Sequence, residues 1–309
     1  MVAVPASSRF VLTGPSGWIG LAMLDALTRA FDGHLDARVT TFGSQARSMT
    51  LTSGKQFDIR ALETITADDI AGAHVIHLAY LTKEKADKLG EQAFTATNDA
   101  IDDAVLAAIA GARPASLFVA SSGAAALAER GVDRHPYGLA KLRQEARFQA
   151  WGKAAGVPVI AGRIFNLAGP HINKLQSYAI SNFALQAREK GKIVIEARVP
   201  VFRSYLHIDD LCELVIGAAV QGIGRDKPID LCGAEVVEME DLAALVAEAS
   251  PNTPTISRGA VDFACPSIYL GDHTQTKVLA MELGNRLSAL PLQVRDTIAW
   301  LDRANIMQD

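Results

Sequence analysis

The chain has 309 residues, of which 49% are hydrophobic and 21% charged, a composition that excludes a wholly disordered protein and allows one large domain or two unequal ones. Its formal net charge of -4 excludes the strongly basic character of proteins that bind nucleic acid or anionic membranes. No apolar run reaches the length that a membrane-spanning helix needs, and the N-terminus lacks the basic and hydrophobic segments of an export signal, so we expect a cytoplasmic protein.

From its start to about Phe165, the chain alternates short apolar runs with longer amphipathic segments. Apolar residues at helical spacing predict helices, and the short runs predict strands that are apolar on both faces. Such strands, separated by helices, are typical of a parallel sheet covered on both sides. We therefore predict an α/β fold, a Rossmann-like doubly wound parallel sheet, with its first domain over residues 1–165. The predicted strands are residues 9–14, 37–42, 73–79, 115–122 and 157–165, and the predicted helices are residues 18–31, 98–112 and 137–156.

After Phe165 the alternation loosens. The elements predicted there are a helix over residues 177–190, short strands near Ile193 and Tyr205, helices from Asp209 and Met239, and a final helix over residues 294–305. This pattern predicts a smaller, mixed α/β lobe over residues 166–309. A segment near residues 202–232 is expected to return to the first domain.

The sequence indicates neither a disulfide framework nor a metal site. Cys212, Cys232 and Cys265 are odd in number and far apart, which is typical of reduced thiols in a cytosol. The seven histidines show no metal-ligand spacing among themselves or with the cysteines, so we predict no bound metal.

Three glycines, Gly14, Gly17 and Gly20, join the first predicted strand to the first predicted helix. In a doubly wound sheet this turn faces the cofactor crevice. Gly14 would permit the tight turn, Gly17 would let the backbone approach a pyrophosphate at the helix N-terminus, and Gly20 would let the helix pack closely on the strand. The spacing is one residue longer than the usual dinucleotide fingerprint. The strand before it and the helix after it favour a dinucleotide site over a glycine-rich turn without a ligand.

The end of the second predicted strand indicates which dinucleotide is bound. A carboxylate at this position would bind the adenosine 2′-hydroxyl and repel a 2′-phosphate. The sequence VTTFGSQARS has Gly43 where that acid is expected, followed by Ser44 and Arg47. A hydroxyl and an unopposed guanidinium suit a phosphate, so the sequence favours NADP over NAD. The alternative is that Arg47 is a solvated loop residue, which leaves NAD open.

A tyrosine and a lysine, Tyr137 and Lys141, lie at i and i+4 of a predicted helix and therefore on one face of it. A free phenol has a pKa of about 10, and a neighbouring cation favours the phenolate, so Lys141 would help Tyr137 to act as a base. Upstream, the strand ASLFVASS ends in Ser121 and Ser122, at the edge where ligands bind in such sheets. A Y-x-x-x-K pattern alone is typical of an ordinary helix face. After a phosphate-binding turn and a strand that ends in serine, it indicates a catalytic pair.

The order of these motifs resembles that of the extended short-chain dehydrogenases/reductases, the NAD(P)-dependent nucleotide-sugar epimerase/dehydratase family, over nearly the whole chain. FDI, VIHLA and TATNDAI precede the serine strand, and RIFNLAGP and FRSYLHIDDL follow the tyrosine and lysine. The resemblance implies catalytic roles for Ser122, Tyr137 and Lys141, with Lys141 also binding the nicotinamide ribose. It implies that residues 1–165 are the dinucleotide-binding domain and that residues 166–309 mainly bind substrate. Asn166 and Arg203 are expected to hold the nucleotide diphosphate of the substrate, and Ser122 is also expected to contact the substrate. The residues expected to contact the cofactor are Gly14, Ser16, Gly17, Trp18, Ile19, Gly20, Ser44, Arg47, Asp58, Ile59, Leu78, Ala79, Tyr80, Asn98, Tyr137 and Lys141.

The chain also departs from the family pattern. The family's dehydratases carry an Asp-Glu pair just after the catalytic serine or threonine, whereas this chain has Gly123 and Ala124. Neither side chain moves a proton, so 4,6-dehydration by the usual route is not expected. The short segment from Ser122 to Tyr137 leaves the identity of the substrate open. Four family positions have an architectural alternative: Asn98, Arg163, His207 and Asp210.

The sequence therefore predicts an NAD(P)-dependent enzyme that transfers hydride at a sugar carbon of a nucleotide sugar, as a 4-epimerase or a keto-sugar reductase, with Tyr137 as acid/base. The alternatives are a reductase of a non-sugar carbonyl and a non-catalytic dinucleotide-sensing protein of the same fold. We expect a small-molecule substrate and no nucleic-acid or membrane partner. Relatives commonly dimerise through the helices that correspond to residues 98–112 and 137–156. Small residues such as Ala104 and Ala107 would allow close helix approach, so we predict a homodimer. The alternative is that these alanines reflect helix propensity on a solvated face.

Overall fold

The computed structural model describes residues 3–35, 37–52 and 54–306, with the backbone alone for residues 304–306. The chain forms two compact units. The first consists of Met1–Ile164 and Cys212–Asp230, and the second of Phe165–Leu211 and Leu231–Asp309. Helix α8 (Ile208–Val220) begins in the second unit and ends in the first.

The first unit is built on a sheet that, within the described residues, has eight strands in the order β11-β7-β6-β5-β1-β2-β4-β3. The strands from β7 to β4 pair in parallel, whereas the edge strand β3 runs antiparallel to β4. This order confirms the predicted Rossmann-like, mostly parallel α/β fold. The strands are β1 (Phe10–Thr13), β2 (Val39–Gly43), β3 (Arg47–Thr50), β4 (Gln56–Ala61), β5 (His74–His77), β6 (Ser116–Ser122), β7 (Val159–Ile164) and β11 (Ile229–Leu231).

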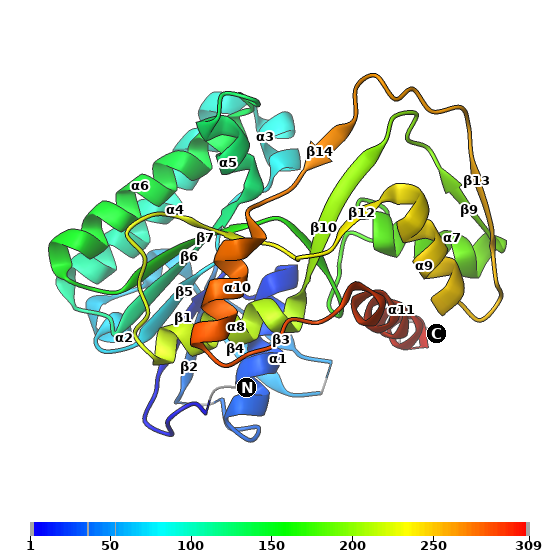
Figure 1. Ribbon diagram of the computed structural model, residues 1–309. Coiled ribbons are helices and arrows are strands. Elements are labelled where there is room, and N and C mark those ends of the chain that lie inside the picture. The colour runs from blue at the N-terminus through cyan, green and yellow to red at the C-terminus, as the bar shows by residue number, and fades with distance from the viewer. Residues whose placement is uncertain (1–2, 36, 53, 307–309) are drawn as a thin grey trace. The chain divides into compact units, whose positions relative to one another are not determined.

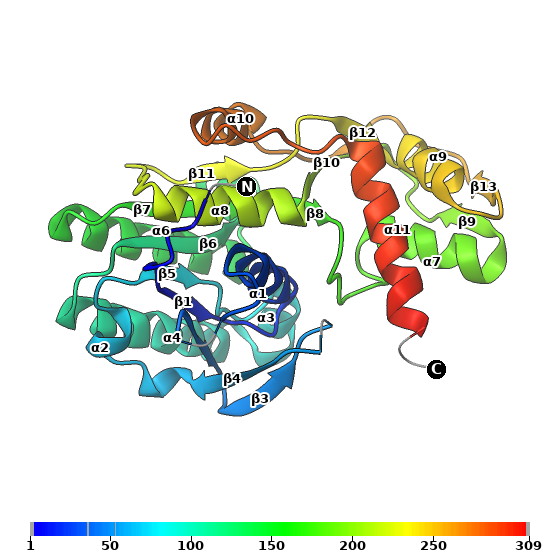
Figure 2. The same ribbon diagram turned by 90° about the horizontal axis from the view of Figure 1, so that it is seen from below.

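Helices cover both faces of this sheet, as Figures 1 and 2 show. Helices α4 and α6 lie against one face, where Val105, Ile109 and Phe148 join the strands in a buried core. Helix α1 and the end of α8 lie against the other face, where Leu24 and Val215 are buried. The helices of this unit are α1 (Trp18–Ala30), the 3-10 helix η1 (Leu62–Thr64), α2 (Ala67–Ile70), α3 (Lys83–Leu89), α4 (Glu91–Gly111), α5 (Gly123–Glu129) and α6 (Pro136–Ala155).

Several elements of the first unit lie where the apolar pattern predicts no element. β3 and β4 form an antiparallel pair at the edge of the sheet, and the side chains of β3 are mostly exposed. An exposed edge strand has no apolar run to mark it. Helices α3 and α5 have seven residues each, which is too short for a clear helical period.

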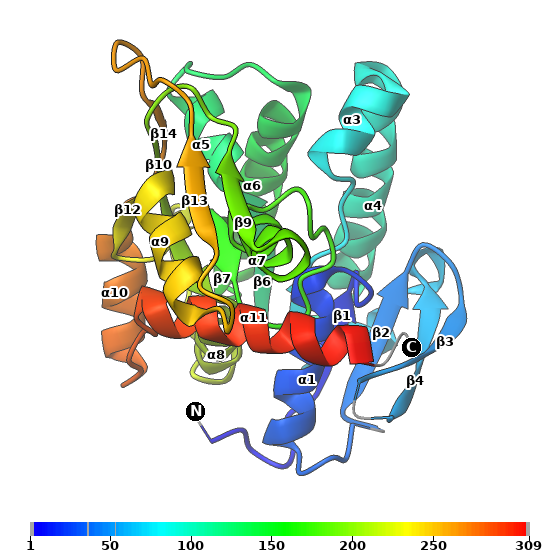
Figure 3. The same cartoon turned by 90° about the vertical axis from the view of Figure 1, so that its right-hand side faces the viewer.

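The second unit contains a smaller sheet centred on β10 (Val201–His207), the strand expected near Tyr205. Strand β10 pairs in parallel with β8 and β14 and antiparallel with β12. Strands β9 and β13 form a separate parallel pair, and Figure 3 shows them side by side, next to α7, α9 and α11. The remaining elements are β8 (Asn166–Ala168), α7 (Ala179–Lys190), β9 (Lys192–Ile195), β12 (Val236–Glu238), α9 (Met239–Ala249), β13 (Thr255–Arg258), β14 (Ser267–Tyr269), α10 (His273–Glu282) and α11 (Leu290–Ile306).

Candidate active site

The glycine turn joins β1 to α1, and its glycines are needed for different reasons. Gly14 adopts φ +72°, a left-handed conformation that favours glycine, and a Cβ there would lie 2.8 Å from the Ala79 amide nitrogen. A Cβ on Gly20 would collide with the Gly14 carbonyl oxygen. The packing of the turn itself therefore requires both glycines. The Cβ position of Gly17 has only the Gly14 carbonyl oxygen nearby, at 3.7 Å, and otherwise faces open space within the described residues.

The open position at Gly17 lies at the N-terminus of α1. Gly17 is the N-cap of this helix and makes no side-chain cap hydrogen bond. The first helical turn contains no acidic residue, and the Trp18 side chain is buried while Ile19 is half-buried. An exposed helix N-terminus with a bare backbone suits a pyrophosphate, which would meet backbone N–H groups here. Ser16 is exposed in the same turn.

The glycine at the end of β2 has a packing reason of its own. A Cβ on Gly43 would lie 2.9 Å from the Ile59 Cγ2 atom, so the side chain of Ile59 fills the space beside the β2 terminus. Ile59 is buried in β4. Its neighbour Asp58 lies on the exposed face of that strand and accepts a 2.5 Å hydrogen bond from the Ser48 hydroxyl. The strand thus points Ile59 and Asp58 to opposite faces.

The two residues expected at a 2′-phosphate lie in different settings. Ser44 follows β2 directly and is exposed. Arg47 is not a loop residue: it begins the edge strand β3 and pairs with Ile59 of β4. Strand β4 therefore lies between Arg47 and β2, which places the Arg47 backbone about 10 Å from the β2 backbone at two strand spacings. To reach a ribose bound at the end of β2, the exposed Arg47 guanidinium would have to extend past the end of β4.

The segment after β5 is held between the glycine turn and α4. The backbone N–H groups of Leu78 and Ala79 donate to Thr13 Oγ1 at 3.1 and 3.0 Å. Asn98 is fully buried; its Oδ1 accepts from the Leu81 N–H at 2.8 Å and its Nδ2 donates to the Phe94 carbonyl at 3.1 Å. Asn98 therefore fixes the chain beside the expected cofactor-binding residues, which is an architectural role.

The two serines at the end of β6 point to different partners. Ser121 is buried and its hydroxyl donates to the Glu145 carboxylate. Ser122 ends the strand and is the N-cap of α5, where its Oγ accepts from the Ala124 N–H at 3.2 Å. Ser122 is half-buried, so it is the serine that the end of β6 presents.

Tyr137 and Lys141 lie one helical turn apart at the start of α6. Tyr137 is half-buried, and its ring lies 6.4 Å, centroid to centroid, from the rings of Tyr80 and Phe94. Lys141 is buried; its Nζ donates to the Ala120 carbonyl at 2.7 Å and to Gln144 Oε1 at 2.9 Å. The same Nζ lies 3.5 Å from the centroid of the Tyr80 ring. Lys141 thus joins α6 to the end of β6 and to the segment after β5.

Burial lowers the pKa of Lys141 to about 7, while the negative charges of Asp102 and Glu145 act to raise it. A lysine with this pKa is partly neutral at neutral pH. Its charge state therefore depends on the carboxylates around it.

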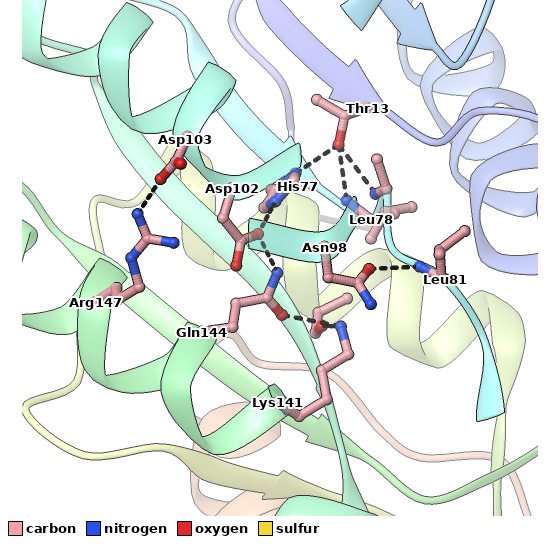
Figure 4. A network of polar contacts seen from close by, with 12 residues as sticks. Thr13, His77, Leu78, Leu81, Asn98, Asp102, Asp103, Lys141, Gln144 and Arg147 are labelled. Atoms are coloured by element: carbon pink, nitrogen blue, oxygen red, sulfur yellow. Dashed lines mark hydrogen bonds and ion pairs between the residues drawn. The ribbon is translucent and has the colours of Figure 1, made fainter. Parts of the chain in front are cut away.

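A chain of buried hydrogen bonds links the glycine turn to Lys141, as Figure 4 shows. Thr13 Oγ1 already accepts two backbone N–H groups, so its own proton points to His77 Nδ1, 2.7 Å away. His77 Nδ1 is therefore an acceptor, and His77 Nε2–H donates to Asp102 Oδ1 at 3.1 Å. Gln144 Nε2 also donates to Asp102 Oδ1, at 2.7 Å. With these assignments, each hydrogen bond of the chain has one donor and one acceptor.

Arg163 is a structural partner, in agreement with the architectural interpretation of the sequence. Its Nε and Nη2 donate to the Glu145 carboxylate at 2.9 and 2.8 Å, and its Nη1 donates to Glu129 at 2.6 Å. Burial alone would lower the pKa of Arg163, but the bonds to Glu145 and Glu129 outweigh that effect and raise it. This ion pair ties β7 to α5 and α6.

The second unit brings Asn166 and Arg203 onto neighbouring strands. Asn166 pairs with Tyr205 in the β8–β10 register, and its Nδ2 donates to the Ser204 carbonyl at 3.2 Å. Arg203 is half-buried; its Nη1 donates to the carbonyls of Phe202 and Ser267 at 2.8 and 3.0 Å, and its Nη2 donates to Ser267 Oγ at 3.2 Å. Burial lowers the pKa of Arg203.

His207 and Asp210 make contacts that organise the second unit. His207 Nδ1 accepts from the Asp209 N–H at 3.1 Å, and its Nε2 lies 3.4 Å from the Asp296 carboxylate. Asp210 accepts from the N–H and the hydroxyl of Ser288 at 2.7 and 2.9 Å. These bonds give both residues architectural roles.

The structure adds residues near Lys141 that the sequence analysis did not select, above all His77, Asp102 and Gln144. Asp102 follows Asn98 by one helical turn, and both polar residues lie among the buried apolar positions of α4. The signal available in the sequence was this pair of polar residues on the apolar stripe of a helix. The partners of Asp102 could not be predicted, because they come from β5 and α6.

Some features of the described residues bear on the class of protein. No helix within residues 3–35, 37–52 and 54–306 combines the length and the apolar character needed to cross a bilayer. Over the same residues, no group of three or more histidine, cysteine, aspartate or glutamate side chains is arranged to hold a metal ion. The cysteines carry thiols rather than disulfides, with Cys212 and Cys232 buried and Cys265 exposed.

A Rossmann-like sheet, a glycine turn on its first helix, and a tyrosine and lysine on the helix after a serine-ended strand together define a dinucleotide-binding protein of the extended short-chain dehydrogenase/reductase type. Residues 10–228 match the NAD dependent epimerase/dehydratase family. The chain belongs to that family.

Individual proteins resemble the chain over different lengths. The dTDP-L-rhamnose 4-epimerase of Burkholderia thailandensis is 27% identical over 113 residues, which are 36% of this chain and 31% of that enzyme. A solved NAD dependent NDP-hexosamine 5,6-dehydratase involved in tunicamycin biosynthesis superposes with a TM-score of 0.74 at 16% identity, covering 95% of this chain and 97% of that one. RMD from Pseudomonas aeruginosa, complexed with NADPH, has a TM-score of 0.70 at 19% identity and covers 96% and 100%. At these identities the solved structures show a shared fold.

Proposed function

We propose that this chain is an NAD(P)-dependent enzyme that transfers hydride at a sugar carbon of a nucleotide sugar, with Tyr137 as acid/base. The observation that carries the proposal is the arrangement at the end of β6. Lys141 Nζ bonds to the Ala120 carbonyl, two residues before Ser122, and Tyr137 lies one turn before Lys141 on the same helix. Membership of the NAD dependent epimerase/dehydratase family supports the same reaction class.

The residues divide the work of proton transfer between them. A bound dinucleotide would supply or accept the hydride. The Tyr137 phenolate takes the proton of the substrate alcohol on oxidation, the resulting hydroxyl returns it on reduction, and Ser122 Oγ holds the same substrate oxygen. The Lys141 ammonium stabilises the phenolate form of Tyr137 through its positive charge. The rings of Tyr80 and Phe94 cover one side of Tyr137 and exclude water there.

Within the family, we propose epimerisation at C4 or reduction of a keto sugar rather than 4,6-dehydration. Elimination of water needs an acid and a base beside the substrate. Gly123 and Ala124, which open α5 directly after Ser122, have no side chain that exchanges a proton. The structural likeness to a 5,6-dehydratase is a likeness of fold.

For the cofactor we propose NADP in preference to NAD. Gly43 stands where a carboxylate would repel a 2′-phosphate, and the exposed Ser44 and Arg47 follow it. Relatives of the same fold include an NAD-dependent enzyme and a complex with NADPH. The distance from Arg47 to β2 makes Ser44 the nearer of the two candidate partners for a phosphate.

For the substrate we propose that Asn166 and Arg203 hold a nucleotide diphosphate. They lie on paired strands of one unit. The bonds of Arg203 to Phe202 and Ser267 fix its guanidinium and leave part of its N–H fork for phosphate oxygens. This arrangement supports recognition of an anion without moving the side chain.

We further propose a cytoplasmic homodimer that pairs through α4 and α6. The thiol state of the cysteines supports a reducing compartment. The outer faces of these helices carry small exposed residues, including Ala107 on α4 and Ala146 and Ala150 on α6.

Replacement of Tyr137 by phenylalanine tests the proposed reaction. Turnover of nucleotide sugars with NADP or NAD should fall by about 10²–10⁴-fold in Tyr137→Phe, because the proton-transfer group is lost. Dinucleotide affinity, measured by calorimetry, should stay nearly unchanged. Near-normal turnover in the variant would contradict the role of Tyr137. A dinucleotide that co-purifies with the protein indicates an epimerase that recycles its cofactor, and an empty protein indicates a reductase.

A further inference from the structure

A carboxylate lies buried behind the lysine of the active site. Asp102 on α4 is 2% exposed, and its Oδ1 accepts from both His77 Nε2 and Gln144 Nε2. His77 supplies one of these two hydrogen bonds, and its Nδ1 lies 2.7 Å from the Thr13 hydroxyl on the other side of the ring. Burying a carboxylate is costly unless a positive charge compensates it. Along this network, that charge is the ammonium of Lys141.

Gln144 is the bridge between the two charges. Its Nε2 donates to Asp102 at 2.7 Å and its Oε1 accepts from Lys141 Nζ at 2.9 Å. These two bonds fix which end of the amide faces each partner. The amide dipole therefore points its oxygen at the cation and its nitrogen at the carboxylate, and Gln144 is itself only 1% exposed. Figure 4 shows Gln144 between Asp102 and Lys141, with a dashed line to each.

We propose that Asp102, acting through the Gln144 amide, is a positioning residue that keeps Lys141 charged and aimed at the site. Its effect on catalysis rests on the proposed roles of Tyr137 and Lys141, whereas its effect on Lys141 itself does not. Asp102 acts to raise the pKa of Lys141 against the lowering caused by burial, in agreement with this geometry.

Other charged groups around Lys141 also affect its pKa. Glu145, from the same helix, also raises the Lys141 pKa, but it is already paired with Arg163 of β7. The charged and titratable groups that act on Lys141 directly are Asp102 from α4, Glu145 from α6 and Tyr80 from the segment after β5. His77 of β5 and Arg147 of α6 act on Asp102, and Arg163 of β7 acts on Glu145. Of the two carboxylates, Asp102 is the one whose bridge ends on the Lys141 nitrogen.

The pKa of Lys141 can be measured directly, without substrate, by NMR on protein with ¹³C- and ¹⁵N-labelled lysine. The Lys141 signal is the one that Lys141→Met removes. In Asp102→Asn, which keeps the shape of the side chain but removes its charge, this pKa should fall by about one pH unit or more. Asp103→Asn is the matched control, since Asp103 is the next residue on α4 and pairs with Arg147 at the surface. That variant should leave the Lys141 pKa within about 0.2 of the wild-type value.

A double variant separates charge from structure. In Asp102→Asn with Gln144→Glu, the negative charge moves one residue closer to Lys141. In the wild type one oxygen, Asp102 Oδ1, accepts from both His77 and Gln144, so the Asn side chain must turn to bring its N–H to the Glu carboxylate while its oxygen accepts from His77. The Lys141 pKa should return at least to the wild-type value. An unchanged pKa in Asp102→Asn, or a double variant that resembles Asp102→Asn, would overturn the proposal.

Steady-state kinetics test the consequence of the Asp102 variants for catalysis. At a pH above 7, kcat of Asp102→Asn should fall about tenfold with KM within about twofold, and the double variant should recover. A wild-type protein without turnover on any nucleotide sugar or simpler carbonyl would refute the proposed function. The NMR titration would still decide the role of Asp102.

Discussion

At the scale of single residues, Lys141 makes the stability of the fold depend on pH. Its pKa falls from 10.5 in an open chain to about 7 in the folded protein because the side chain is buried. Between these two values the unfolded chain binds the extra proton, so stability rises as the pH rises through this window. As the pH falls toward 7, Lys141 becomes protonated in the folded protein too, and the cost of burying its charge opposes folding.

Replacement of Lys141 by methionine isolates this contribution. The difference in free energy of unfolding, wild type minus Lys141→Met, should rise by about 2 kcal/mol between pH 7 and pH 9 in favour of the wild type. Urea unfolding of the cofactor-free proteins at both pH values measures it, and other titrating groups cancel in the difference. A constant difference would mean that Lys141 titrates in the folded protein as it does in the open chain.

The two serines of β6 offer a second test at this scale. Ser122→Ala should lower turnover more than Ser121→Ala, because Ser122 ends the strand while the hydroxyl of Ser121 is bound to Glu145. Ser121→Ala should instead lower the free energy of unfolding by about 1–3 kcal/mol, since it removes one of the two buried hydrogen bonds that Glu145 Oε1 accepts and leaves only the one from Arg163 Nε. Steady-state kinetics and urea unfolding on the same preparations compare the two. The reverse order of turnover would assign the catalytic position to Ser121.

At the scale of elements, the sequence predicted what a local apolar pattern can mark. The strands β1, β5, β6 and β7 of the central sheet are short apolar runs, and α1, α4 and α6 carry apolar stripes that cover the sheet. The edge strand β3 was not predicted because its sequence RSMT is mostly exposed and, within the described residues, it pairs with β4 alone. Its pairing with β4, the next strand in the chain, defines it, and a search for apolar runs does not record that pairing.

The candidate site likewise contains residues that a local sequence pattern predicted and residues that it did not. Tyr137 and Lys141 were predicted because they lie four residues apart in one helix, and the glycine turn because its glycines lie close together, at positions 14, 17 and 20. Asp102 and Gln144 are each an ordinary polar residue on a helix. They become a buried bridge only because α4 packs beside α6 on the sheet.

The position of β3 also sharpens the test of the cofactor. If Arg47 extends from the sheet edge to a 2′-phosphate, Arg47→Ala should weaken NADPH binding by about tenfold and leave NADH nearly unchanged. Ser44→Ala is the companion variant, since Ser44 is nearer to the end of β2. Calorimetric titration with both dinucleotides gives the ratio. Equal effects on NADPH and NADH, or none on either, would indicate NAD as the natural cofactor.

At the scale of the whole molecule, α4 and α6 have faces with different tasks. Their inner faces bury Val105, Ile109 and Phe148 against the sheet. An Asp103–Arg147 ion pair joins the two helices near the surface. Beside it lie the small exposed side chains of the outer faces, which would let a second copy approach closely.

The proposed dimer predicts a specific response to a charge on this outer face. Ala146 is exposed on α6, so Ala146→Glu should leave the folded chain intact but place two carboxylates near the two-fold axis. Light scattering at micromolar concentration should give twice 32.9 kDa for the wild type and about 32.9 kDa for Ala146→Glu. Ala244→Glu, at an exposed alanine of α9, is the matched control and should remain dimeric. A wild-type mass near 32.9 kDa would rule the dimer out, and a dimer that survives Ala146→Glu would place the interface elsewhere.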